Sequence, residues 1–204
     1  MVPRSRFKAG GPNFYGRGRK DMTTFVIVLA AIVVVLLMWF ISAQRMLAML
    51  DENINNAMSQ IGVQLSSRWD ALSALLDLAK GYAEHEYKTL SETIRARRPV
   101  NANSSPAEAA EQENLLIGAM GRIMAVAEQY PTLKADQNYT RTMDSVNQYE
   151  GMVRQSRLIY NDSVTKLNRR IRMFPTNLIA GMMGFSKRDY LETNEAKADM
   201  PSMK

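Results

Sequence analysis

The sequence predicts an all-α protein in which one N-terminal transmembrane helix continues into a long antiparallel up-and-down helical bundle. Three observations predict this fold class. An uncharged apolar run covers residues 25–41, apolar residues recur at helical spacing between residues 44 and 173, and prolines divide that region into three long segments. Leu, Ala and Met are plentiful, which favours helices, and the absence of Cys excludes disulfides and thiolate metal sites.

A basic tail, residues 1–21, precedes the apolar run. It holds six Lys or Arg residues against Asp21 alone, a net charge of +5, whereas the rest of the chain holds 20 basic and 19 acidic residues. Several glycines and Pro12 stand among these charges, a composition typical of a flexible segment. We expect these charges to act as a membrane topology signal and predict no binding to nucleic acid.

Residues 22–43 form the predicted transmembrane helix. Thirteen of the residues from 25 to 41 are Leu, Ile, Val or Phe, and about 22 residues at ~1.5 Å each reach ~33 Å, enough to cross the hydrocarbon core of a bilayer. The alternatives are a buried core helix and a cleaved signal peptide, but the run is apolar on all sides and longer than the apolar part of a signal peptide. The Lys and Arg residues before the span predict a cytoplasmic N-terminus, with the bundle in the periplasm or outside the cell.

The first amphipathic helix is predicted to continue without a break from the span to about residue 98, where Pro99 ends it. Apolar residues recur every eleven residues along it, as at Leu50, Ile61 and Leu72. A period of ~3.67 residues per turn favours a nearly straight helix over a heptad coiled coil.

A second helix is predicted to start at Ser105-Pro106-Ala107-Glu108, which has the form of a capping box with Pro at the first helical position. It runs to about Gln129, and Pro131 stops it. Its apolar face consists of Leu116, Met120, Ile123 and Ala127.

A third long helix is predicted over about residues 135–173, and a short apolar segment, residues 178–185, follows it. The third helix keeps a seven-residue apolar row: Tyr139, Val146, Val153, Tyr160, Leu167 and Phe174. Because none of these helices can bury its apolar stripe alone, we expect them to pack into one bundle covering residues 44–190. Residues 191–204 are expected to form a flexible C-terminal tail.

Charged residues interrupt the apolar rows at inward-facing positions. Arg68 and Asp70 do so in the first helix, and Glu150 and Arg157 do so in the third. A buried charge is tolerated only when it is paired, so one hypothesis is a polar layer that fixes the register of the bundle or binds a partner group. The alternative is that these positions rotate to the edge of the apolar stripe and meet solvent.

No catalytic or metal-binding motif is recognisable in the sequence. His85 is the only histidine, and Thr89 stands where the zinc motif HExxH would need its second histidine. We therefore expect no cofactor and no metal. Glu86 is a candidate binding residue, and an enzyme would be indicated only by turnover that depends on Glu86 or Glu150.

A basic cluster lies late in the third predicted helix. It consists of Lys166, Arg169, Arg170 and Arg172. The cluster could contact acidic lipid or a partner, and the alternative is a solvated helix face.

Several ordered segments, which together cover about residues 46–200, resemble one known family. They are Ile61-Gly62-Val63-Gln64-Leu65 with Arg68-Trp69-Asp70, Lys80-Gly81-Tyr82-Ala83-Glu84-His85-Glu86 with Ala96-Arg97, Ala127-Glu128-Gln129-Tyr130-Pro131-Thr132-Leu133-Lys134-Ala135, Arg157-Leu158-Ile159-Tyr160-Asn161-Asp162, Asn168, and Phe174-Pro175-Thr176-Asn177-Leu178-Ile179-Ala180. The pattern resembles the LemA family. One departure is Ala71-Leu72-Ser73-Ala74-Leu75-Leu76, where the family commonly has a proline, and its loss should leave the first helix straighter.

The resemblance implies a membrane-anchored antiparallel helical bundle and gives no catalytic residues to carry over, although Asn161 joins the candidate binding residues. The first functional hypothesis is a non-enzymatic structural or interaction protein of the bacterial envelope that self-associates through its bundle. Its expected partners are the lipid bilayer, further copies of the chain and other envelope proteins. The alternative is a sensory or ligand-binding module with a polar layer inside the bundle.

Overall fold

A computed structural model describes residues 17–191, with the side chains of residues 22–191 apart from Glu86. Within these residues the chain forms α-helices and no strand, as the sequence predicted. The chain divides into two compact units, residues 1–45 and 46–204, and each is described by itself. Most of the predicted N-terminal tail and residues 192–204 of the predicted C-terminal tail lie outside the described residues.

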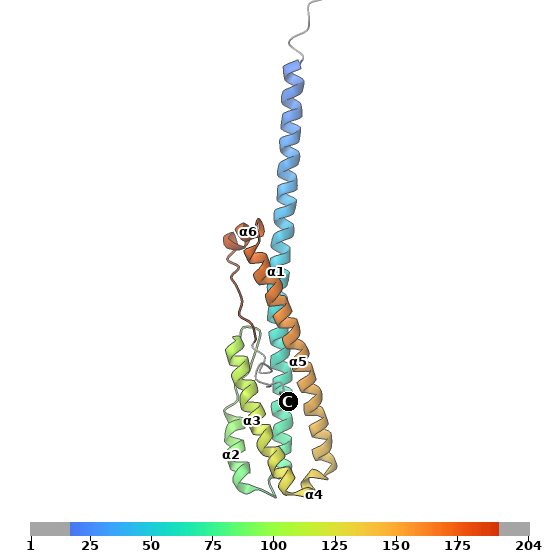
Figure 1. Cartoon of the computed structure of the whole chain (residues 1–204), viewed down its shortest axis with the longest axis vertical. Helices are drawn as coiled ribbons and strands as arrows, with labels where there is room; N and C mark the ends of the chain where they lie inside the picture. Colours follow the sequence, from blue (N-terminus) through green and yellow to red (C-terminus); the bar gives the residue numbers. More distant parts are fainter. Residues whose placement is uncertain (1–16, 192–204) are drawn as a thin grey trace, which may run out of the picture. The chain divides into compact units, whose positions relative to one another are not determined.

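Helix α1 (Arg17–Ala79) contains the predicted membrane span and continues into the bundle (Figure 1). Its most apolar window of 18 residues has a mean hydropathy of 3.1, and none of that window is buried. A core helix of a soluble domain would be mostly buried, so this exposure favours the membrane interpretation. Within the described residues, this is the one helix long and apolar enough to cross a membrane, which is compatible with a single-pass membrane protein.

The second unit is a bundle in which the chain reverses direction between consecutive long elements (Figure 1). The helices that follow α1 are α2 (Glu84–Arg95), α3 (Pro106–Gln129), α4 (Pro131–Lys134), α5 (Gln137–Arg172) and α6 (Thr176–Met182). The single turn α4 joins α3 to α5, and α6 caps the far end of α5. Successive helices are therefore antiparallel, as predicted, but the number of elements is larger than predicted.

The predicted continuous first helix to residue 98 is wrong, because α1 ends at Ala79 and α2 starts at Glu84. The amide of Tyr82 donates to the carbonyl of Ala79 at 2.9 Å, and Gly81 lies in this turn. Glycine is a weak helix former, and an acidic residue such as Glu84 suits the first turn of a new helix. The additional reversal makes α2 antiparallel to α1 and lets α3 run in the same direction as the bundle part of α1.

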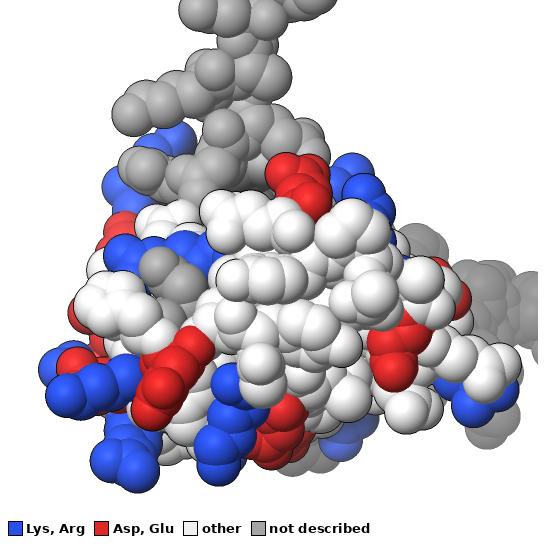
Figure 2. Space-filling view, turned by 90° about the horizontal axis from the view of Figure 1, so that it is seen from below, with Lys and Arg blue, Asp and Glu red and all other residues white. Residues whose placement is uncertain are grey.

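Figure 2 shows the end of the bundle that carries the α1–α2 and α3–α5 connections. Its centre is uncharged, and acidic and basic side chains lie around the edge. The rings of Tyr82 and Tyr130 contact each other with 5.4 Å between their centroids, and this contact links the two connections.

The predicted apolar rows fill the core along most of their length. Along α1 the buried members of the eleven-residue rows are Leu50, Ile54, Ile61, Leu65, Leu72 and Leu76. All four predicted apolar residues of α3 are buried, and α5 buries Tyr139, Val146, Val153, Tyr160 and Leu167. The capping box of Ser105 and Glu108 is confirmed, since each side chain bonds the other residue's backbone amide. Phe174 is an exception at 79 % exposed, because α5 ends at Arg172 and Phe174 lies in the turn before α6.

Candidate functional site

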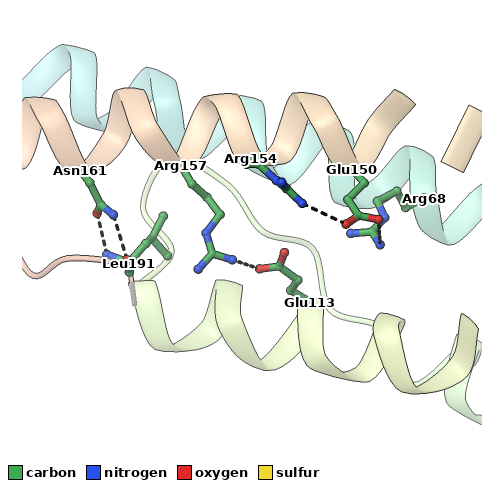
Figure 3. Close-up of polar contacts among 7 residues, drawn as sticks. All are labelled: Arg68, Glu113, Glu150, Arg154, Arg157, Asn161 and Leu191. Atoms are coloured by element: carbon green, nitrogen blue, oxygen red, sulfur yellow. Dashed lines mark hydrogen bonds and ion pairs between the residues drawn. The ribbon is translucent and has the colours of Figure 1, made fainter. Parts of the chain in front are cut away.

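Arg68 lies on the inward face of α1 and is buried, with 3 % of its surface exposed. Its Nη2 atom lies 3.8 Å from Glu150 Oε2 on α5 (Figure 3). Burial lowers the pKa of the Arg68 guanidinium, because desolvation disfavours the charged form, while Glu150 and Glu113 act in the opposite direction. Within the described residues, Arg68 Nε and Nη1 have no hydrogen-bond partner, so this buried group is incompletely satisfied.

Glu150 joins the buried Arg68 to the surface. Its side chain is 48 % exposed, and its second oxygen lies 3.6 Å from Arg154, one turn further along α5. The two alternatives left open by the sequence thus apply to different residues. Arg68 is inside the bundle, and its counter-ion Glu150 lies at the edge of the apolar stripe.

A second ion pair, between Arg157 and Glu113, connects α5 to α3 (Figure 3). Both side chains are 15 % exposed, so this pair is better shielded from water than the Arg68–Glu150 pair. The sequence pattern did not single out Glu113. Its position between the buried residues Gln112 and Leu116, at the edge of the apolar face of α3, was the available signal.

Asp70 does not belong to this layer. Residues two positions apart on a helix, such as Arg68 and Asp70, point about 200° apart. Asp70 is therefore exposed on another side of α1, where its Oδ1 accepts from Arg97 Nη1 at 2.7 Å. Arg97 and Arg98 lie in the connection between α2 and α3. Gln112 of α3, which the sequence pattern did not single out, holds this connection from inside the bundle, since its Oε1 accepts from the amide of Arg98 at 2.8 Å. Asp70 therefore fastens the α2–α3 connection and does not pair with Glu150 or Arg157.

Asn161 binds backbone in place of a charged partner. Its side-chain amide donates to the carbonyl of Leu191 and accepts from the amide of Leu191, both at 2.9 Å (Figure 3). Asn168 makes the same pair of bonds with Arg188, at 2.9 and 3.0 Å. We call these four bonds the amide clasp.

The spacing of the amide clasp follows from backbone geometry. Seven residues of helix, from Asn161 to Asn168, advance ~10.5 Å, and three residues of extended chain, from Leu191 back to Arg188, advance ~10 Å. The chain after α6 therefore lies extended and antiparallel along α5. Tyr160 adds a bond from its hydroxyl to the carbonyl of Asp189 at 3.1 Å. Burial raises the pKa of that hydroxyl; the positive charge of Arg188 acts against this rise, and the negative charge of Asp189 adds to it.

Glu86 belongs to α2, and its side chain lies outside the described ones. Among the described residues, no three His, Cys, Asp or Glu side chains gather in a way that could hold a metal ion. The charged layer consists of Arg68, Glu113, Glu150, Arg154 and Arg157 (Figure 3). It carries three arginines and two glutamates, and its chemistry is that of ion pairs that link α1, α3 and α5.

The layer and the amide clasp lie within residues 57–204, and over this range the chain matches the model of the LemA family. The chain belongs to the LemA family. This confirms the resemblance drawn from the segments around Gly62, Tyr130 and Asn161. A relative named Protein LemA, from Metamycoplasma hominis, is 28 % identical over 179 residues, which covers 83 % of this chain and 80 % of that protein.

The chain is also similar to magnetosome proteins. It is 35 % identical over 78 residues to Magnetosome protein MamQ 2 of Paramagnetospirillum magneticum and 32 % identical over 78 residues to Magnetosome protein MamQ of Magnetospirillum gryphiswaldense. These similarities cover 38 % of this chain, and the chain spans only 29 % of the length of each of these relatives. Together, the apolar helix, the membership of the LemA family and the similarity to these relatives suggest a membrane-associated protein.

Proposed function

We propose that this LemA-family protein is a membrane-anchored, non-catalytic structural and interaction protein of the bacterial envelope, and that it self-associates through its bundle. The exposed apolar helix of residues 22–43 supports the anchor, with the lipid bilayer as its first partner. The residues of the charged layer serve the bundle, because they pair with one another between helices, and the described residues hold no group of His, Cys, Asp or Glu that could bind a metal ion.

The proposal of self-association rests on the exposed outer face of α3. Ile117 and Met124 are 49 % and 46 % exposed, and with Gly121 they form one stripe at helical spacing. A side chain built at Gly118 or Gly121 would meet nothing within 4 Å, so the backbone here is open to a close approach. A second copy could place its own Ile117 over these glycines in a two-fold contact, in which the same face serves both subunits.

The test is the mass of the full-length protein in nanodiscs or detergent, measured by light scattering over a range of concentrations. Gly121→Gln should give a smaller species than the wild-type protein, because the added side chain blocks close approach. Gln is also a better helix former than Gly by roughly 0.5–1 kcal/mol, so the fold should be retained.

Gly151→Gln is the matched control, because Gly151 lies on α5 and is equally open. This variant should keep the wild-type mass. A wild-type protein that is monomeric at every concentration would refute self-association. Equal effects of the two variants would show that the contact does not use the face of α3.

A ligand-binding module is the second candidate function, and Arg68 favours it. A buried guanidinium with two nitrogen atoms that lack partners within the described residues could bind a small carboxylate or phosphate group. An anionic compound that raises the melting temperature of the wild-type protein but not of Arg68→Met would support this function.

A further inference from the structure

Helix α6 and the turn before it present an apolar surface to solvent. Phe174 is 79 % exposed, Leu178 59 % and Met182 78 %. The opposite side of α6 is fixed to the bundle, since Ile179 and Ala180 are buried. Exposed apolar groups gathered on so short a segment indicate a binding surface, because single surface apolar residues are normally scattered.

Basic residues lie on both sides of this apolar surface in the sequence. Residues 163–188 contain six Lys or Arg and no Asp or Glu. Two of the six are paired, Lys166 with Asp162 and Arg188 with Asp51. The other four are exposed, and no carboxylate pairs with them in the described part of the chain: Arg169, Arg170, Arg172 and Lys187. We call these four residues together with Phe174, Leu178 and Met182 the α6 surface.

The chain after α6 is bonded to α5 and to a residue of α1 that follows the predicted span closely in the sequence. The amide clasp binds Arg188 to Asn168 on α5, and the Arg188 side chain donates to Asp51 Oδ1 of α1 at 2.8 Å. Asp51 follows Ala43, the last residue of the predicted span, by eight residues. Eight residues reach at most ~28 Å even when fully extended, so the covalent chain keeps Asp51 and the Arg188 bound to it within reach of a bilayer surface.

We propose that the α6 surface is a second membrane contact, which docks on the headgroup region of an anionic phospholipid bilayer. Apolar side chains that enter the acyl boundary, beside Lys and Arg side chains that meet anionic headgroups, are the combination that such surfaces require. The four basic residues of the α6 surface, with which no carboxylate pairs in the described part of the chain, favour an anionic bilayer over a second copy of this chain, whose α6 surface would carry the same charge. This inference rests on the proposed membrane anchor.

The experiment uses single cysteines in the full-length protein, which has no cysteine of its own. Leu178→Cys and Met182→Cys are labelled with an environment-sensitive fluorophore, and the protein is reconstituted in nanodiscs that contain phosphatidylglycerol and a lipid-borne quencher. Leu158→Cys is the matched control, since Leu158 is an exposed apolar residue of α5 outside the α6 surface. Val34→Cys, in the predicted span, reports on the anchor itself.

The proposal predicts that labels at positions 178 and 182 are quenched by the lipid-borne quencher and shift their emission to the blue, while the label at 158 does neither. The quenching should fall in nanodiscs of phosphatidylcholine alone, at high salt, and in the triple variant Arg169→Gln, Arg170→Gln and Arg172→Gln. These substitutions lie at exposed positions, so they should leave the fold unchanged.

The α6 proposal is overturned if the labels at 178 and 182 are quenched from the aqueous phase as fully as the label at 158. It is also overturned if neither the lipid-borne quencher nor a water-soluble quencher reaches these labels, since a second protein copy would then cover the surface. In either case, quenching at position 34 would leave the anchor intact. Absence of lipid quenching at position 34 would refute the anchor and with it the α6 proposal.

Discussion

At the scale of single residues, Arg68 is a buried charge whose counter-ion stays half in water. Desolvation of a guanidinium costs several kcal/mol, and the 3.8 Å contact with Glu150 offsets only part of it. The stability of the bundle should therefore depend less on having Arg68 than on keeping a carboxylate beside it. A buried cation without a nearby anion is the more costly state.

A double-mutant cycle of Arg68→Met and Glu150→Gln tests this dependence. Arg68→Met should be neutral or stabilising, because Met is apolar, similar in volume and removes two buried nitrogens that lack partners among the described residues. Glu150→Gln should lower the free energy of unfolding by about 1–2 kcal/mol, below the usual cost for a buried pair because Glu150 is half exposed. In the Arg68→Met background the same change should cost under ~0.5 kcal/mol.

The measurement is denaturant or thermal unfolding of the four proteins under one condition. If Glu150→Gln costs the same in both backgrounds, Glu150 acts only through Arg154 and the link between α1 and α5 has no energetic weight.

Arg68 and Glu150 interrupt apolar rows and could be predicted from the sequence. Glu113 could not be predicted, because it lies at the edge of an uninterrupted apolar face and its pairing depends on how α3 turns toward α5.

At the scale of elements, the sequence predicted helices where their ends have strong local signals. The capping box at Ser105 and the proline at position 131 mark the limits of α3 correctly. The break at Gly81 was missed because both eleven-residue rows continue past it, the row of Leu72 to Ala83 and the row of Leu76 to Tyr87, and one glycine is compatible with a helix. The exposure of Phe174 was missed for a related reason, since a seven-residue period does not tell where the helix ends.

Gly62 gives an element-scale prediction about how the α2–α3 connection packs on α1. A Cβ atom at Gly62 would overlap the carbonyl oxygen of Val100 and lie 2.7 Å from its carbon, so the backbone of the connection must move. Gly62→Ala should therefore lower the free energy of unfolding by about 1–2 kcal/mol, even after the gain in helix propensity.

Gly151→Ala is the control for Gly62→Ala, since the same methyl group at Gly151 meets nothing within 4 Å and Gly151 lies outside the face of α3 proposed for self-association. It should raise the free energy of unfolding by up to ~1 kcal/mol, the difference in helix propensity between Ala and Gly. The two variants are compared by chemical denaturation of the full-length protein. Equal stabilisation by both would mean that the connection does not press on α1 at Gly62.

At the scale of the whole molecule, ion pairs and the amide clasp hold segments that the hydrophobic core alone would leave loose. The apolar rows bring the helices together, but they do not fix the register between them. Arg157 with Glu113 sets α5 against α3, and the amide clasp sets the chain after α6 against α5. The clasp was beyond prediction because its partners are backbone groups of an extended segment, which leave no mark on side-chain periodicity.

The charges on either side of the span predict the side of the membrane on which the bundle lies. Six Lys or Arg residues precede the span within about 20 residues, whereas Arg45 followed by Asp51 and Glu52 comes after it. The bias of Lys and Arg toward cytoplasmic flanks predicts a cytoplasmic N-terminus and a bundle on the opposite side. The basic residues of the α6 surface do not change this prediction, because they lie more than 100 residues after the span and only charges close to its ends set the orientation.

Single cysteines and a membrane-impermeant maleimide test the orientation in spheroplasts. Leu158→Cys should be labelled in intact spheroplasts, whereas Ser5→Cys should be labelled only after lysis. Val34→Cys should stay unlabelled until detergent is added, which checks that the membrane is intact. The reverse labelling of the first two variants would place the bundle in the cytoplasm, and the α6 surface would then face the inner leaflet, where anionic lipids and their attraction for Lys and Arg are strongest.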